Sequence, residues 1–261
     1  MATVRPPAVA GMFYPDDPET LRREVIRFLE TAKHPTITPK AVVAPHAGYI
    51  YSGPVAASVY SALTNEADRI HRVVMFGPAH RLAFRGIAYS DADFFRTPLG
   101  DVSVDKKALD EAASLPHVHH FEAPFEGEHC LEVQLPFLQM TLIDFSIVPF
   151  LVGDATADEV AGIIERLWGG DETLFVISSD LSHYLDYESA RAIDSRTTQA
   201  IEALQPEAIA YDQACGRTPL TGLLKAAKQH GLKAKTLDLR NSGDTAGPRN
   251  QVVGYGAYAF Y

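Results

Sequence analysis

The sequence predicts one α/β domain with a mostly parallel central sheet and helices on both of its faces. Short apolar segments rich in β-branched residues alternate with segments whose apolar residues recur at helical spacing, which is typical of parallel βαβ units. No internal repeat, low-complexity tract or long linker divides the 261 residues. We therefore expect residues 1–261 to form a single domain.

The segments expected to form strands are short and end at turn-forming residues. Each is apolar through most of its length, as a strand buried on both faces requires. These segments span residues 41–44, 72–76, 145–148 and 173–177. A last strand is expected within 251–261, where aromatic and apolar residues alternate with small ones.

The first expected helix spans residues 18–33. Asp17 can cap it, Pro18 suits its first turn, and apolar residues follow at helical spacing. The other expected helices lie near 54–64, 105–114, 129–142, 156–168, 187–204 and 218–230.

Composition argues against several classes of partner. The formal net charge of -10 repels nucleic acid and anionic lipid surfaces. No segment reaches the roughly 18 apolar residues of a membrane span, and no secretory leader pattern is present. Two cysteines in a chain of this length do not make a disulfide framework. We expect a cytoplasmic protein with free thiols and without a nucleic-acid or membrane partner.

Three histidines follow predicted strands. His46, His80 and His183 each come shortly after an apolar strand segment, and parallel strands bring such positions to one edge of the sheet. Imidazole is a common metal ligand and also titrates near neutral pH. One such histidine is more often an ordinary loop residue, but three at equivalent positions favour a shared site for metal binding or proton transfer.

Two further groups could join this site, and each has a structural alternative. Asp180 could orient the imidazole of His183 or accept its proton, although it could equally cap the next turn. His129 and Glu132 lie at spacing i, i+3 and could line the pocket from one helix face. A solvated helix start explains that pair equally well.

The cysteines and the histidine run have different surroundings. Cys130 lies among apolar residues and is expected to be a buried thiol. Cys215 lies at a helix junction where Arg217 would favour the thiolate, so it could bind a soft metal, although an inert thiol is the more ordinary interpretation. The histidine-rich run at residues 117–120 is expected in a surface loop. Motifs for hydride transfer and nucleotide hydrolysis are missing from the sequence.

Several motifs taken together resemble the Memo family. They are APHAGY at 44–49, GPAH at 77–80, EH at 128–129, SSD at 178–180 with His183, and CGR at 215–217. AGMFYP at 10–15 and RTPLG at 96–100 extend the likeness over nearly the whole chain. The joint order of these motifs makes the resemblance specific.

The resemblance implies a fold similar to class III extradiol dioxygenases (LigB-like), which open catechol rings with Fe(II) held by two histidines and a carboxylate. By this correspondence His46 and His80 are metal ligands, Cys215 is a thiolate in place of the carboxylate, and His183 is the acid/base. Thiolate is softer than carboxylate, so Fe(II) or copper is expected, with zinc as an occupant on purification.

The leading functional hypothesis is a metal-dependent redox protein, a dioxygenase-like oxidoreductase acting on a small-molecule substrate. The two histidines and the cysteine would bind the metal, and His183, oriented by Asp180, would move protons. His129 is the third catalytic candidate.

Two alternatives belong to other classes. A non-catalytic module could hold a peptide or partner protein in the same pocket, as the treatment of animal Memo proteins as phosphopeptide-binding factors implies. Arg81, which stands where some relatives have a second histidine, and Arg217 could then receive an acidic or phosphorylated group. A metal-free hydrolase using Cys215 and His183 is the third hypothesis.

Overall fold

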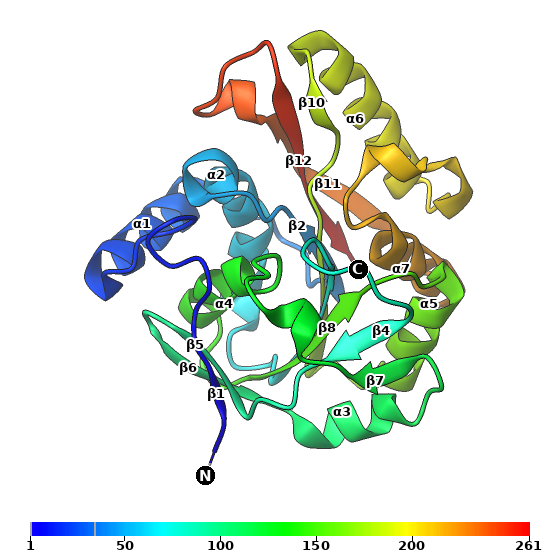
Figure 1. Cartoon of the computed structure of the whole chain (residues 1–261). Coiled ribbons are helices and arrows are strands. Elements are labelled where there is room, and N and C mark those ends of the chain that lie inside the picture. The colour runs from blue at the N-terminus through cyan, green and yellow to red at the C-terminus, as the bar shows by residue number, and fades with distance from the viewer. Residues whose placement is uncertain (1, 34) are drawn as a thin grey trace.

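A mixed, mostly parallel sheet runs through the centre of the computed structural model, which describes residues 2–33 and 35–261 (Figure 1). Its central strands follow the order β6-β8-β3-β9-β2, and each neighbouring pair is parallel. In that order they span Gly100–Val104, Ser146–Val152, Arg72–Pro78, Thr173–Ser178 and Ala41–Ala44. The α/β class and the mostly parallel sheet are thereby confirmed.

Further strands, mostly antiparallel, extend the sheet. On one side, β12 pairs antiparallel with β2, β11 and β10. On the other, β5 pairs antiparallel with β6 and parallel with β1, while β4 joins β8 and β7. These strands are β1 (Val4–Arg5), β4 (Ile87–Tyr89), β5 (Phe94–Thr97), β7 (Val118–His120), β10 (His183–Leu185), β11 (Ala234–Asn241) and β12 (Val252–Phe260). Only β12 was predicted from the sequence.

The helices cover both faces of the sheet. One group, α1, α2 and α4, packs together on one side, and α5 packs against α7 on the other (Figure 1). The helices are α1 (Pro18–Thr31), α2 (Tyr49–Tyr60), α3 (Lys106–Ala113), α4 (Leu135–Thr141), α5 (Ala157–Arg166), α6 (Tyr187–Glu202) and α7 (Arg217–Gln229). No helix in the described part of the chain is long and apolar enough to span a membrane.

Local chemistry explains where these helices begin. The carboxylate of Asp17 accepts the backbone N–H of Thr20, so the predicted cap of α1 is confirmed. Thr156 and Glu159 form a reciprocal capping box at the start of α5. α1 then buries one apolar face, which consists of Leu21, Val25 and Phe28, whereas α2 is buried on nearly all sides.

Three sequence expectations need correction. The helix expected near 54–64 begins at Tyr49 and contains Pro54 inside it. The helix expected at 129–142 is replaced by a 3-10 turn at Glu132–Gln134 followed by the shorter α4. The run at 117–120 is not a plain loop, because Val118–His120 forms β7, an edge strand paired with β4.

Candidate metal centre

Three metal-competent side chains from distant parts of the chain meet at the carboxyl ends of the central strands. His46 follows β2, His80 follows β3, and Cys215 lies just before α7. Their ligand atoms all lie within 4.8 Å of one another. The thiol Sγ of Cys215 is 3.2 Å from Nε2 of His46. The structure thus brings together the three residues that the sequence analysis assigned to a metal.

The hydrogen bonds around His46 direct the lone pair of Nε2 toward the thiol of Cys215. The hydroxyl of Ser178 donates to the carbonyl of Cys130 at 2.6 Å, so its oxygen accepts a hydrogen bond from the Nδ1–H of His46 at 2.9 Å. The lone pair of this neutral tautomer then lies on Nε2, beside the thiol. Burial and the nearby His80 lower the pKa of His46 to about 3, so the ring is neutral at physiological pH.

A buried carboxylate orients His80 in the same way. Glu128 accepts the backbone N–H of His80 at 2.6 Å through Oε2, and its Oε1 lies 2.9 Å from the ring Nδ1. Oε1 also accepts the backbone N–H groups of His129 and Cys130. Burial alone would raise the pKa of Glu128, but these donors and His80 outweigh it and lower that pKa to about 2. A carboxylate on Nδ1 is the usual partner of a metal-binding imidazole.

The thiol of Cys215 is held by the loop that follows β9. Its Sγ accepts the backbone N–H of Asp180 at 3.3 Å, and its own N–H donates to the carbonyl of Asp180. A Cβ at Gly216 would come within 2.8 Å of the Ser178 carbonyl oxygen, so the close approach of this loop requires glycine.

The expectation that Arg217 favours the thiolate is wrong. Its Nε donates to the backbone carbonyl of Ile209 at 2.7 Å. Burial, with the nearby carboxylate of Asp180, raises the pKa of Cys215 to about 12. The thiol therefore keeps its proton unless a bound metal cation stabilises the thiolate.

Asp180 lies next to the donors but makes other contacts than expected. Its Oδ1 accepts the backbone N–H of His46 at 2.8 Å. Among the hydrogen bonds of the described residues, none joins Asp180 to the ring of His183. Burial raises the pKa of Asp180. The contacts of Asp180 therefore position His46 and Cys215. The role of Asp180 in orienting His183 stays a prediction.

His129 lies over the donor cluster. Its ring stacks on His80 with centroids 4.9 Å apart and meets His46 edge-on at 5.4 Å. Burial and the nearby His46 lower the pKa of His129 to about 4. Its Nδ1 is 3.3 Å from a Glu128 oxygen but makes no hydrogen bond.

Glu132 does not share a pocket-lining face with His129. Its carboxylate accepts the N–H groups of Ala8 and Val9 and the hydroxyl of Tyr14. It therefore anchors the amino-terminal segment. The shared helical face expected from their spacing is wrong, because His129 precedes the 3-10 turn in which Glu132 lies.

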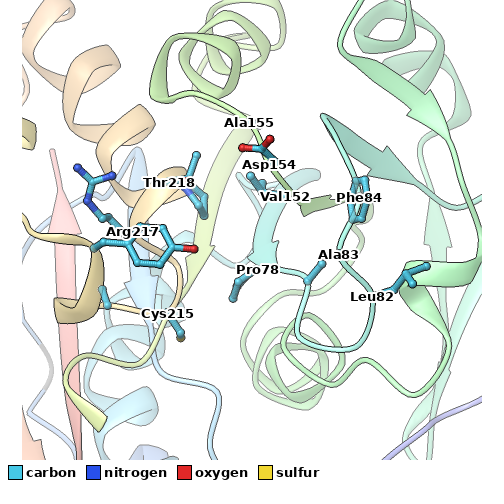
Figure 2. Close-up of a pocket in the computed structure, with 15 residues that line it drawn as sticks. Pro78, Leu82, Ala83, Phe84, Val152, Asp154, Ala155, Cys215, Arg217 and Thr218 are labelled. Carbon is cyan, nitrogen blue, oxygen red and sulfur yellow. The ribbon is translucent and has the colours of Figure 1, made fainter.

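Two hollows adjoin the donor cluster. The histidine hollow has a volume of about 600 Å³, and its walls carry imidazoles, aromatic rings and Arg81. Its main lining residues are Phe13, His46, Tyr51, His80, His129, Asp180, His183, Tyr184 and Tyr255. A second hollow of about 620 Å³ lies on the Cys215 side, where Arg217 and Thr218 face Leu82 and Phe84 (Figure 2).

Several groups at this site were not predicted from the sequence. The roles of Ser178 and Glu128 in fixing the imidazoles were not predicted, although both residues lie in motifs quoted above. The aromatic walls Phe13, Tyr51 and Tyr184 were also missed. Tyr184 directly follows the motif residue His183, and this adjacency is the one sequence signal that would have indicated it.

Comparison with known proteins identifies the family of this chain. The family model described as Memo-like protein matches residues 5–259. A MEMO1 family protein from Aquifex aeolicus is 38% identical, with 97% of each chain covered. A relative of the same description from Methanosarcina barkeri is also 38% identical, with 97% of this chain and 98% of the relative covered. Another from Archaeoglobus fulgidus is 38% identical, with 98% of this chain and 99% of the relative covered. The chain belongs to the Memo family.

Proposed function

We propose that the protein is a metal-dependent redox protein that binds Fe(II) or copper through His46, His80 and Cys215. One observation carries the proposal: two imidazoles, each with a hydrogen-bond partner at Nδ1, lie beside a thiol, and one ligand atom from each of the three residues is within 4.8 Å of the other two. Two nitrogens and one sulfur suit iron and copper, and the sulfur favours Cu(I). Zinc would also fit this donor set on purification.

The donor cluster also leaves room for a reactant. His46 and His80 line the histidine hollow and Cys215 lines the second hollow, so a small organic molecule could reach the donor cluster. Bound iron or copper would supply electron transfer to or from dioxygen. His183 and His129, both lining the hollow, would hold or move protons on the molecule bound there. The proposal includes a dioxygenase-like reaction and a cytoplasmic location. It also includes the expected similarity to the fold of class III extradiol dioxygenases.

Metal analysis of protein purified without oxygen tests the proposal. We expect about one iron or copper ion per chain in the wild type. The variants His46→Ala, His80→Ala and Cys215→Ala should each lose most of it. Cys130→Ala is the matched thiol control, because Cys130 is buried and outside the donor set. Unchanged metal content in all three ligand variants would end the proposal.

A binding module is the second candidate, and Arg81 favours it. This exposed arginine lines the histidine hollow, and its Nε donates to the carbonyl of Gly127. An acidic or phosphorylated peptide could bind there. Arg217, the other expected cation, lines the second hollow instead. Peptide capture that survives chelation of all metal, with no turnover under oxygen, would favour this candidate.

The metal-free hydrolase receives less support. The closest imidazole to the thiol of Cys215 is that of His46, whose Nε2 is 3.2 Å away, rather than that of His183. Hydrolysis that survives alkylation of Cys215 would exclude it.

A further inference from the structure

A third hollow lies between α6 and β11, which pack against each other (Figure 1). Its volume of about 390 Å³ suits a small molecule. This α6–β11 hollow shares no lining residue with the two hollows beside the donor cluster. Charged residues dominate its walls: Glu188, Arg191 and Asp194 belong to α6, Arg240 belongs to β11, and Asp244 follows β11.

Asp194 is the buried carboxylate of the α6–β11 hollow. It is only 2% exposed, and its Oδ1 accepts the backbone N–H of Ser182 at 3.0 Å. No hydrogen bond from another described residue reaches this carboxylate. A Cβ at Gly254 would collide with it, so glycine at that position makes room for the charged group. A carboxylate buried with one neutral donor is costly unless a cation joins it.

The chain itself does not supply that cation. Among the ion pairs of the described residues, none includes Asp194, and Arg240 is held in a bidentate pair by Asp238. Both clusters of metal-competent side chains in the described part of the chain contain His80, so neither belongs to this hollow. The partner that suits Asp194 is therefore an organic ammonium group.

Arg191 offers a positive group on the same side of α6. It precedes Asp194 by three residues, and residues at that spacing are neighbours on a helix surface. Its guanidinium lies 3.9 Å from Glu188, and both side chains are largely exposed, so this pair contributes little to stability. A carboxylate could replace Glu188 there and accept two hydrogen bonds. The hollow thus combines a site for an ammonium group with a site for a carboxylate.

We infer that the α6–β11 hollow is a second binding site that takes a small zwitterion of the amino-acid class, with its ammonium group on Asp194 and its carboxylate on Arg191. The inference does not depend on the proposed function, because neither residue belongs to the metal centre. The site is also linked to the candidate acid/base, since Asp194 holds the N–H of Ser182, the residue before His183.

Three probes of similar size separate the two charges. L-Alanine carries both charges, ethylamine carries only the ammonium group, and propionate carries only the carboxylate. Ligand-observed NMR titration of the full-length protein at pH 8 gives a Kd for each probe. The variants are Arg191→Gln and Asp194→Asn. Arg196→Gln is the matched control, because Arg196 is an exposed arginine of α6 outside the lining.

We expect the wild type and Arg196→Gln to bind L-alanine about 3- to 10-fold more tightly than ethylamine or propionate, as one additional ion pair would give. Arg191→Gln should bind L-alanine no more tightly than ethylamine. Asp194→Asn should bind it no more tightly than propionate. Equal binding of the three probes by the wild type, or a preference for L-alanine retained in either variant, would overturn the inference.

The link to His183 has its own measurement. In protein with isotope-labelled histidine, the ring signals of His183 are assigned from their loss in His183→Gln. We expect L-alanine to shift these signals in the wild type and to leave them in place in Asp194→Asn at the same concentration. Signals of His183 that stay unmoved while L-alanine binds to the wild type would overturn the link.

Discussion

Glu128→Gln removes the charge of the carboxylate that holds His80 while keeping its shape. The carboxylate accepts four buried or half-buried N–H groups, two from His80 and one each from His129 and Cys130. An amide has a single acceptor oxygen. Whichever way the amide turns, at least one of these donors faces an NH2 group.

The size of the effect follows from these contacts. A hydrogen bond to a charged acceptor contributes about 1.5–3 kcal/mol, a neutral one about 0.5–1.5 kcal/mol, and an unpaired buried donor costs about 1–3 kcal/mol. We therefore expect Glu128→Gln to lower the free energy of unfolding by about 3 kcal/mol and Tm by roughly 6–12 °C. Because Glu128 also fixes the proton on Nδ1 of His80, metal affinity should fall about 10- to 100-fold.

Two assays separate stability from metal binding. Thermal unfolding of metal-free protein reports the first, and competition with a chromophoric chelator reports the second. Glu132→Gln is the matched control, since this buried carboxylate also accepts several donors but anchors the amino-terminal segment. It should lose stability and keep its metal affinity. If both variants bind metal equally well, Glu128 does not orient His80 for a metal.

Two further predictions concern groups outside the metal centre. Lys40 donates to three backbone carbonyls between residues 168 and 173, so Lys40→Met should lower the free energy of unfolding in urea by about 2 kcal/mol; a loss below about 0.5 kcal/mol would contradict this. Burial raises the pKa of Asp194, so its protonated form favours the native state, and that stabilisation is lost as pH rises through the folded pKa. Asp194→Asn should therefore raise Tm above that of the wild type by more at pH 8 than at pH 4. An equal rise at both pH values would show that no buried charge is involved.

The strands that could be predicted are those formed by a continuous apolar segment. β2, β3, β8, β9 and β12 were predicted because each is buried on both faces for most of its length. The missed strands lack that pattern. β1 has two residues, and β11 contains three charged residues and is only partly buried over most of its length along β12. Their pairing depends on contacts that no local pattern reveals.

The site could be predicted to the extent that its residues follow strands. His46, His80 and His183 were found because carboxyl ends of parallel strands share one edge. Cys215 follows no strand, and only the family resemblance assigned it to the metal. Glu128 binds a residue 48 positions away, so its role required the folded loop.

The unpredicted part of the site is also the part that connects it to the core. Ser178 fixes the tautomer of His46, and its oxygen also accepts from Nε2 of Gln134 at 2.8 Å. Gln134 in turn accepts the hydroxyl of the buried Tyr60. The direction of the His46 lone pair is therefore set by a chain of buried hydrogen bonds that crosses from β9 to α2. Since buried polar networks hold a single arrangement only when every member is paired, the sheet and helix packing that defines the fold also defines the geometry offered to a metal.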